Sequence, residues 1–259
     1  MILDDIVAKK RLQLAEETAA MPVSVLERRA LEAPPVRDFE AAIRKPGLSV
    51  IAEVKKASPS KGLIAPDFRP VETARAYVAG GTDCISVLTE RHFFQGSDEV
   101  LVAVRQAVSC PILRKDFLLC ERQVIEARAI GADAVLLIAS ILDDATLVRL
   151  LRLATELGMA ALLEAHTEDE ARRLVQAGGR IIGVNNRNLD TFAVDLGTFG
   201  RVRRVIPEAC AAVAESGIHG PEDVRRLMAD GCDAILVGES LMRSGDPAMA
   251  LAELKRTKT

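Results

Sequence analysis

Short aliphatic runs alternate with longer amphipathic stretches along most of the chain. The runs are four to six residues long and rich in Val, Ile, Leu and Ala, which is typical of parallel strands covered on both faces. They occupy 49–54, 84–88, 111–114, 134–138, 159–163, 181–184, 210–214 and 234–237. The segments between them have a helical period, as in 143–157, where Leu147, Leu150 and Ala154 form one stripe. Strand followed by helix, repeated eight times, predicts an α/β fold, a closed (β/α)₈ TIM barrel.

A local repeat marks several junctions between the predicted helices and strands. The pattern Gly-x-Asp stands directly before a strand at 81–83, 131–133 and 231–233, and Gly178-Gly179 is a partial echo. Glycine can adopt the left-handed backbone conformation that ends a helix. The repeat therefore indicates a common turn that delivers each helix to the next strand, as a repeated supersecondary unit requires.

The first 48 residues precede the first predicted strand. Their apolar spacing predicts helices over 2–14 and 25–31 and a short helix that Asp38 caps and that ends at Ile43. A segment of this length is too short for an independent domain. We therefore expect residues 1–259 to form a single (β/α)₈ barrel domain, with 1–48 as an N-terminal helical extension packed on the barrel across one end.

Composition narrows the class of protein. The chain has 259 residues, which fits one (β/α)₈ barrel or two smaller domains. Apolar residues make up 49% of it, Trp is absent and aromatics reach 3%, so the core must be aliphatic. The net charge is −3 with both signs interspersed, which argues against a nucleic-acid partner or a membrane surface. No apolar run approaches the length needed to span a bilayer.

The cysteines indicate a reducing compartment. Cys84, Cys110, Cys120, Cys210 and Cys232 have no Cys-x-x-Cys spacing, and most lie in or beside apolar runs, as small buried hydrophobes do. The N-terminus also lacks the charged-then-apolar signature of a signal peptide. We expect a cytoplasmic protein. The sequence does not set its oligomeric state and is compatible with a monomer.

Charged and amide side chains follow six of the predicted strands. Glu53 and Lys55 lie two positions apart and therefore project from the same face. Taken alone, this pair fits either an edge strand with a chance ion pair or the open end of a barrel, because charges inside a doubly covered strand are costly to desolvate. The other strands end at or near Lys115, Glu164, Asn185, Arg187, Glu215 and Glu239. Strand ends meet at one mouth of a barrel, so this convergence favours an active site there.

Glycine and serine follow the last two strands. Ser216-Gly217 and Gly238-Glu239-Ser240 each precede a predicted helix. Glycine lets the backbone approach an anion, and N–H groups at a helix start donate to it. The loops after the seventh and eighth strands are also the frequent phosphate site of this fold. We expect a phosphorylated small molecule to bind here.

The types of side chain at the strand ends limit the chemistry. Lysines can supply protons, glutamates can remove them, and Asn and Arg can orient polar groups. His92, His166 and His219 are scattered without metal-ligand spacing, and we interpret those near strand ends as bystanders. No Gly-x-Gly-x-x-Gly follows a strand, which argues against a dinucleotide. The pattern predicts acid–base catalysis without metal or cofactor on a sugar-derived phosphate.

The segment 51–62, Ile-Ala-Glu-Val-Lys-Lys-Ala-Ser-Pro-Ser-Lys-Gly, resembles the signature of the indole-3-glycerol phosphate synthase family of tryptophan biosynthesis. Further resemblance lies in Leu88-Thr-Glu, Phe94-Gln-Gly-Ser, Leu113-Arg-Lys-Asp-Phe, Leu163-Glu-Ala-His-Thr, Gly183-Val-Asn-Asn-Arg-Asn-Leu, Ala214-Glu-Ser-Gly-Ile and Val237-Gly-Glu-Ser-Leu-Met. It covers essentially the whole chain. It implies a cofactor-free carboxy-lyase that converts 1-(2-carboxyphenylamino)-1-deoxyribulose 5-phosphate to indole-3-glycerol phosphate by ring closure, decarboxylation and dehydration.

The resemblance also implies roles for the site residues. Lys115 would protonate the substrate carbonyl oxygen during ring closure, and Lys55 would contact the anthranilate carboxylate and assist dehydration. Glu53 and Glu164 would be the candidate bases, with their division of labour left open. Asn185 and Arg187 would position the reacting chain, and Glu215 would orient its hydroxyls. Phe94 and Phe117 would form the apolar walls around the aromatic ring. The implied phosphate positions are Ser58, Ser216, Gly217, Gly238, Glu239 and Ser240.

Two other functions fit part of the pattern. A phosphosugar isomerase of the same fold would also need an acid, a base and a phosphate loop, but the set of two lysines and two glutamates argues against it. A barrel that only binds a phosphorylated metabolite would not need acid–base partners at several strand ends.

Overall fold

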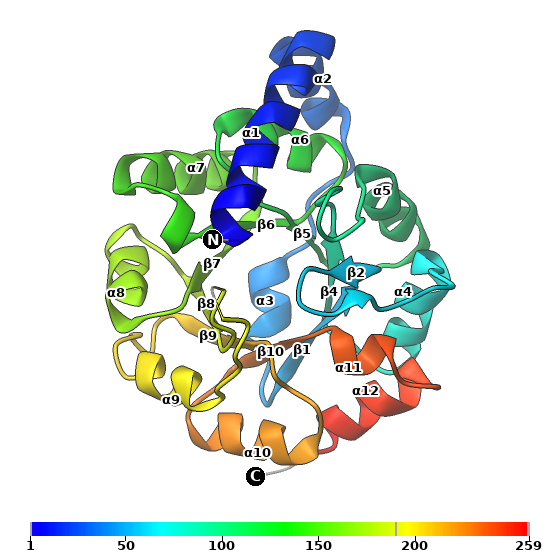
Figure 1. Cartoon of the computed structure of the whole chain (residues 1–259), viewed down its shortest axis with the longest axis vertical. Helices are drawn as coiled ribbons and strands as arrows, with labels where there is room; N and C mark the ends of the chain where they lie inside the picture. The colour runs from blue at the N-terminus through cyan, green and yellow to red at the C-terminus, as the bar shows by residue number, and fades with distance from the viewer. Residues whose placement is uncertain (1, 190, 258–259) are drawn as a thin grey trace.

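The predicted strands form one closed parallel barrel, in the order β1-β10-β9-β8-β7-β6-β5-β4 (Figure 1). The structure is a computed structural model that describes residues 2–189 and 191–257, so both ends of the predicted range 1–259 lie outside the described residues. The barrel strands are β1 Ser49–Val54, β4 Cys84–Leu88, β5 Ile112–Lys115, β6 Ala134–Ile138, β7 Ala160–Ala165, β8 Ile181–Asn185, β9 Ala211–Glu215 and β10 Ala234–Val237. The fold class expected from the sequence is thereby confirmed.

Helices surround the barrel and connect its strands (Figure 1). They are α4 Pro70–Ala79, α5 Asp98–Ala107, α6 Glu121–Ala129, α7 Asp144–Glu156, α8 Glu168–Gln176, α9 Gly197–Arg203, α10 Pro221–Ala229, α11 Glu239–Met242 and α12 Pro247–Lys255, with a 3₁₀ turn, η1, at Ala139–Ile141. The predicted stripe on α7 is largely buried, with Leu147, Leu150 and Ala154 fully covered. Asp143 caps this helix by accepting the Thr146 N–H at 2.7 Å.

Side chains along each strand point alternately into the barrel and out toward the helices, which divides the core into two layers. Side chains such as Ile51, Leu113 and Leu162 fill the barrel interior. Their strand neighbours, Val50 and Val54 among them, pack outward against the helices. Both layers are almost wholly aliphatic, which explains how a chain without Trp builds a core of this size.

The Gly-x-Asp repeat fixes the entry ends of adjacent strands. The glycines that end the helices have left-handed φ angles: Gly81 87°, Gly131 90°, Gly178 94° and Gly231 83°. Each aspartate accepts a backbone N–H from the neighbouring barrel strand: Asp83 from Val50 at 2.9 Å, Asp133 from Ile112 at 2.8 Å and Asp233 from Ala212 at 2.7 Å. The repeat therefore turns the chain and also ties one strand to the next at the end opposite the mouth.

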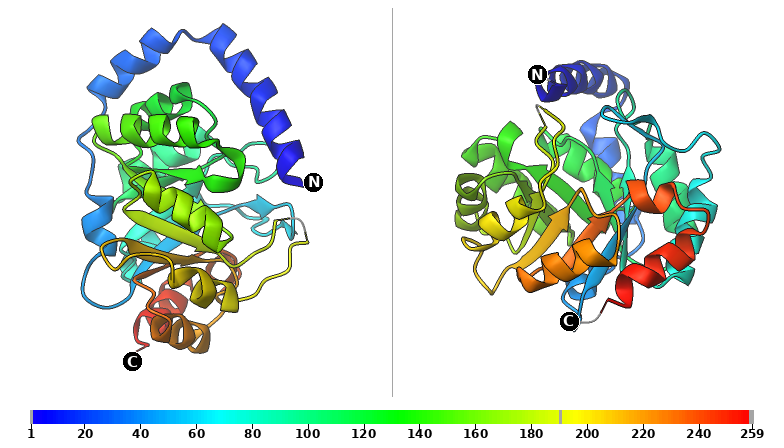
Figure 2. Two further views of the ribbon diagram at one scale, coloured as in Figure 1. Left: turned by 90° about the vertical axis from the view of Figure 1, so that its left-hand side faces the viewer. Right: turned by 60° about the horizontal axis from the view of Figure 1, so that its bottom comes forward.

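The N-terminal extension runs from one end of the barrel to the other (Figure 2). It contains α1 Ile2–Ala20, α2 Val23–Glu32 and α3 Phe39–Ile43. Helix α1 lies beside the mouth, α2 packs on α6 through Leu26 and Ala30, and α3 inserts Phe39 and Ile43 into the barrel floor. The sequence suggested contact with one end, whereas the extension reaches both.

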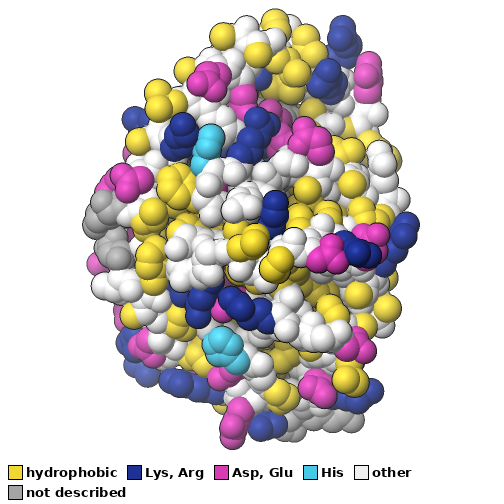
Figure 3. Space-filling model, turned by 45° about the vertical axis from the view of Figure 1, so that its right-hand side comes forward, with side chains coloured by type: hydrophobic (Ala, Val, Ile, Leu, Met, Phe, Trp, Pro, Cys, Tyr) yellow, Lys and Arg dark blue, Asp and Glu magenta, His cyan; other side chains and the backbone are white. Residues whose placement is uncertain are grey.

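The outer surface mixes both signs of charge. Acidic and basic side chains are interspersed with apolar ones over the face in Figure 3. Exposed ion pairs connect neighbouring helices, such as Arg149 with Glu121 at 3.0 Å and Arg173 with Asp144 at 2.7 Å. Such pairs contribute little to stability, so the fold depends mainly on its core. Within the described ranges, every helix falls short of the length and apolar character that crossing a bilayer requires.

Replacing the most deeply buried aspartate of the repeat should be costly. Asp133 is fully buried and also pairs with Arg105 at 2.5 Å. Asp133→Ala leaves this guanidinium buried without its counter-ion, so we expect the free energy of unfolding to fall by about 3 to 5 kcal/mol. Urea titration measures it. The matched Asp143→Ala, which removes an exposed helix cap, should cost about 1 kcal/mol. Equal losses in the two variants would contradict the role assigned to the repeat.

Candidate active site

The polar strand ends converge on one pocket at the C-terminal mouth of the barrel. Every residue that the sequence predicted for the site lines it: Glu53, Lys55, Ser58, Phe94, Lys115, Phe117, Glu164, Asn185, Arg187, Glu215, Ser216, Gly217, Gly238, Glu239 and Ser240. They come from all parts of the chain, and barrel closure alone brings them together.

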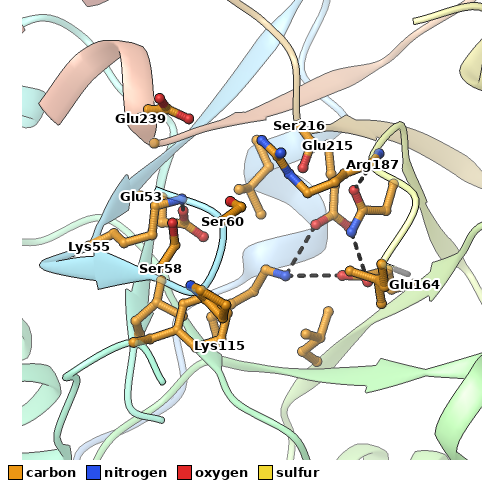
Figure 4. A pocket seen from close by; sticks show the side chains of 18 of the residues that line it. Glu53, Lys55, Ser58, Ser60, Lys115, Glu164, Arg187, Glu215, Ser216 and Glu239 are labelled. Atoms are coloured by element: carbon orange, nitrogen blue, oxygen red, sulfur yellow. Dashed lines mark hydrogen bonds and ion pairs between the residues drawn. The ribbon is translucent and has the colours of Figure 1, made fainter. Parts of the chain in front are cut away.

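Lys115 lies at the centre of the pocket. Its Nζ is 3.0 Å from Glu164 Oε2 and 3.3 Å from Glu215 Oε2 (Figure 4). Burial by itself would lower the pKa of this ammonium group, but the carboxylates of Glu164, Glu215 and Glu53 outweigh it and raise the pKa above its usual value. Lys115 is therefore a fully charged acid held between two carboxyl groups.

The two carboxyl groups beside Lys115 have opposite environments. Burial would raise the pKa of Glu164, yet Lys115, His166 and a hydrogen bond from Asn185 Nδ2 at 3.1 Å hold it below its usual range. For Glu215, burial and the charge of Glu164 prevail over Lys115 and raise the pKa. Its Oε1 is buried and has no hydrogen-bond partner within the described part of the chain. The surroundings therefore favour the ionised form of Glu164 and the neutral form of Glu215.

Two glycines make room for the buried glutamates. A methyl group at Gly183 in β8 would overlap Glu215 Oε1, and one at Gly238 after β10 would overlap Glu53 Oε2. Any larger residue would push these carboxyl groups out of the cluster. Both glycines therefore shape the site through the space that they leave open.

A second lysine–glutamate pair lies on β1 and just after it. Lys55 Nζ is 2.5 Å from Glu53 Oε2, and Glu53 is nearly fully buried whereas Lys55 reaches the pocket opening. The predicted loop 56–62 that follows is a short hairpin, β2 Ala57–Ser58 and β3 Gly62–Leu63. Figure 4 shows Ser58 and Ser60 of this hairpin beside Lys55 and Glu53. The mouth thus has a cation at its rim as well as one at its centre.

The loops after β9 and β10 join at one side of the mouth. Ser216 and Gly217 both have left-handed φ angles, 67° and 78°, and Ser240 Oγ donates to the Ile218 carbonyl at 2.9 Å. The Glu239 carboxylate pairs with Lys61 at 3.3 Å and with Arg243 at 3.4 Å, and it lies apart from the central cluster (Figure 4). Its charge is therefore balanced by two neighbouring cations.

An apolar wall completes the pocket. The rings of Phe94 and Phe117 are 6.1 Å apart at a tilt of 40°. Ile2, Leu3 and Ile6 of α1 add to the lining. This wall suits a flat aromatic group on the side of the pocket away from the serine and glycine loops.

The remaining predicted side chains orient one another. Asn185 Oδ1 accepts the Arg187 backbone N–H at 3.0 Å, and Arg187 Nη1 donates to the Phe192 carbonyl at 3.1 Å. Asn185 thus connects Glu164 to the loop that carries Arg187. In residues 2–189 and 191–257, no cluster of three or more His, Cys, Asp or Glu side chains is arranged to hold a metal ion.

Comparison with known sequences decides the family. The sequence model described as indole-3-glycerol phosphate synthase matches residues 3–254. The chain belongs to the indole-3-glycerol phosphate synthase family. Proteins of that name from Rhodococcus opacus and a Nocardioides species are 49% and 51% identical to it over 253 residues, which cover 98% of this chain and 94% and 97% of theirs. Membership makes the chain a carboxy-lyase of tryptophan biosynthesis that acts on a phosphorylated small molecule.

Solved structures resemble the chain in fold. A 3-hexulose-6-phosphate synthase has a TM-score of 0.64 at 17% identity, covering 82% of this chain and 100% of its own. Thiamine phosphate pyrophosphorylase from Pyrococcus furiosus has a TM-score of 0.62 at 19% identity, covering 83% and 96%. At these identities the likeness concerns the barrel.

Some features of this indole-3-glycerol phosphate synthase site were not expected from the sequence. The role of Gly183 could have been found from its position inside a strand, because a glycine there often marks the close approach of another group. The lining from α1 depends on a buried ion pair between Lys10 and Asp116 at 2.8 Å. The helical period predicted α1, but nothing local showed that Lys10 faces inward.

Filling the space beside Glu215 should damage the site. In Gly183→Ala the added methyl group displaces the Glu215 carboxyl from Lys115, so we expect kcat/KM to fall at least tenfold, which is about 1.4 kcal/mol of transition-state stabilisation. Steady-state kinetics at neutral pH measure it. In the control Gly245→Ala, the new Cβ meets no atom within 4 Å. A wild-type value of kcat/KM in Gly183→Ala would show that activity does not depend on the position of the Glu215 carboxyl beside Lys115.

Proposed function

We propose that this pocket performs the indole-3-glycerol phosphate synthase reaction with the residues that converge at the mouth. The substrate would be 1-(2-carboxyphenylamino)-1-deoxyribulose 5-phosphate, which loses carbon dioxide and water as the indole ring forms. The observation that carries the assignment of roles is the central cluster: one ammonium group, Lys115, between two buried carboxyl groups whose pKa values are shifted in opposite directions.

The substrate is proposed to lie across the mouth. Its phosphate would bind the backbone N–H groups of Ser216–Gly217 and Gly238–Ser240, with Ser58 on the opposite hairpin. Its aromatic ring would rest on Phe94 and Phe117. This placement sets the sugar-derived chain over Lys115, with Asn185, Arg187 and Glu215 in reach of its hydroxyls.

Lys115 is the proposed acid of ring closure. As the aromatic carbon attacks the carbonyl carbon, negative charge develops on the carbonyl oxygen, and the Lys115 ammonium group gives it a proton. Lys55 at the rim would hold the carboxylate, which is then lost as carbon dioxide while its bonding electrons return to the ring. Acid and binding cation thus stand on different strands, as their separate tasks require.

Glu164 is the proposed base of the dehydration. Removal of water needs one proton delivered to the departing hydroxyl, which Lys55 would supply once the carboxylate has left as carbon dioxide, and one proton taken from the neighbouring carbon of the new ring, which becomes aromatic. Glu164 is ionised and adjoins Lys115, so the proton that it takes can reload the lysine. Glu53 pairs with Lys55 instead and would keep that ammonium group oriented toward the pocket.

We also propose that the chain works as a single domain in the cytoplasm. The extension contributes both to the mouth and to the floor, so it belongs to the same folded unit. All five cysteines are free, and burial raises the pKa of the Cys232 thiol to about 12, as suits thiols that stay reduced.

The two lysines should fail in different ways when replaced. Lys115→Met is expected to lower kcat about 1,000-fold, within the range of general-acid catalysis, because its proton matters most in the transition state. The Kd of a substrate analogue should stay within about tenfold. Lys55→Met should weaken binding more, since its partner carboxylate is present in the ground state. Single-turnover kinetics and analogue titration separate the two effects.

The exposed Lys9→Met serves as the control for lost charge. It lies on the outer side of α1 and should match the wild type in both measurements. Near-normal turnover of Lys115→Met would refute the acid assignment and make Lys55 the leading candidate.

A further inference from the structure

His166 stands between the candidate base and a second carboxylate. It follows β7 directly, two residues beyond Glu164. Its Nε2 is 3.5 Å from Glu164 Oε1, and its Nδ1 is 3.4 Å from Glu170 Oε2. The side chain is 16% exposed. The Nε2 atom itself is buried and has no hydrogen-bond partner within the described chain, so Glu164 Oε1 is the acceptor it faces.

The start of helix α8 fixes the outer side of this arrangement. The Thr167 hydroxyl accepts the Glu170 N–H at 3.2 Å, and Glu170 Oε2 accepts the His166 backbone N–H at 2.6 Å. These bonds form a reciprocal cap at the helix start. They hold the Glu170 carboxylate against the imidazole, whose ring is thereby aimed at Glu164.

The groups around the imidazole favour its charged form. Burial alone would lower the pKa of His166, but a hydrogen bond to Glu170 and the charges of Glu164 and Glu170 raise it above its usual value. The facing carboxyl groups come from β7, α8 and β9. The Lys115 cation on β5 approaches Glu164 from the other side. Carboxyl groups from three elements thus lie around the ring, and Glu164 stands between it and the Lys115 ammonium group.

We propose that His166 is a positioning residue for Glu164, an imidazolium that holds the outer carboxylate oxygen and keeps this base ionised. Glu164 then has Lys115 on one oxygen and Asn185 and His166 on the other. The inference rests on the proposed role of Glu164 as base. It also separates His166 from His92 and His219, which are exposed.

Two substitutions test separately the contacts of the His166 ring with Glu164 and with Glu170. The amide nitrogen of Gln reaches the position of Nε2, so His166→Gln keeps a neutral donor toward Glu164. The amide nitrogen of Asn reaches only the position of Nδ1, so His166→Asn keeps the contact with Glu170 and loses the one with Glu164. His92→Asn, at an exposed histidine outside the pocket, is the control.

We expect kcat to fall about tenfold in His166→Asn and less in His166→Gln, with KM within about threefold of the wild type in both. Without the nearby cation, protonation of Glu164 becomes easier, so the acidic limb of kcat/KM should move to higher pH. The wild type should lose activity as the pH rises through the raised pKa of His166, and this step should be missing from both variants. His92→Asn should keep the wild-type profile.

A direct titration of the ring supplies an independent readout. The chain has three histidines, so single substitutions assign their imidazole ¹⁵N signals. His166 should titrate above the ordinary value of about 6.5, and Glu164→Gln should bring its pKa down. A His166 pKa at or below about 6.5 would overturn the inference. So would lower kcat in His166→Asn without any shift of the acidic limb.

The Glu164→Gln variant separates failure of this inference from failure of the proposed function. If Glu164→Gln turns over normally, Glu164 is not the base, and the proposed roles fail together with the inference. If Glu164→Gln is inactive while His166→Asn keeps the wild-type kcat and pH profile, the role of His166 alone is refuted.

Discussion

The ion cluster around Lys115 is the interaction on which the rest of the site depends. Two carboxyl groups from β7 and β9, both almost fully buried, approach one largely buried ammonium group from β5. Charges in such a place are stable only when they are paired. Because one cation cannot fully offset two carboxylates, the pKa of Glu164 is lowered while that of Glu215 is raised. The same packing thus favours the ionised form of one glutamate and the neutral form of the other.

The strand order of the barrel makes this cluster possible, because it sets which strand ends lie close together at the mouth. The aspartates of the Gly-x-Asp repeat tie adjacent strands at the far end, and Gly183 leaves space for the Glu215 carboxyl at the mouth. Residues at opposite ends of the same strands therefore serve stability and chemistry separately. The extension connects the two ends, since α3 closes the floor and Lys10 of α1 pairs with Asp116, next to Lys115.

Much of this arrangement could be predicted from local patterns. Aliphatic runs predicted all eight barrel strands, four with the observed bounds and four with ends shifted by one or two residues, as at 159–163, where β7 is Ala160–Ala165. The shift arises because Glu164 is polar yet continues the ladder, so an apolar run ends before the strand does. Strand-end position also predicted the charged and amide side chains that line the pocket, whereas Ser58, Phe94 and Phe117 were implied by the resemblance to the family.

Several side-chain contacts, both local and between distant segments, could not be predicted in this way. His166 looked like a loop bystander because its partners, Glu164 and Glu170, become neighbours only when the helix cap forms. The overlap between a residue at Gly183 and Glu215, and the inward turn of Lys10, likewise depend on side chains more than thirty residues apart in the sequence.

The protonation states of Glu164 and Glu215 are the central claim, and infrared spectroscopy of the carboxyl C=O stretch tests them most directly. At neutral pH the account predicts a band from one buried neutral carboxylic acid. The band should disappear in Glu215→Gln and also weaken in Glu164→Gln, because Glu215 then has Lys115 to itself and its pKa falls. A band that persists unchanged in Glu215→Gln, or a wild-type spectrum without any such band, would contradict it.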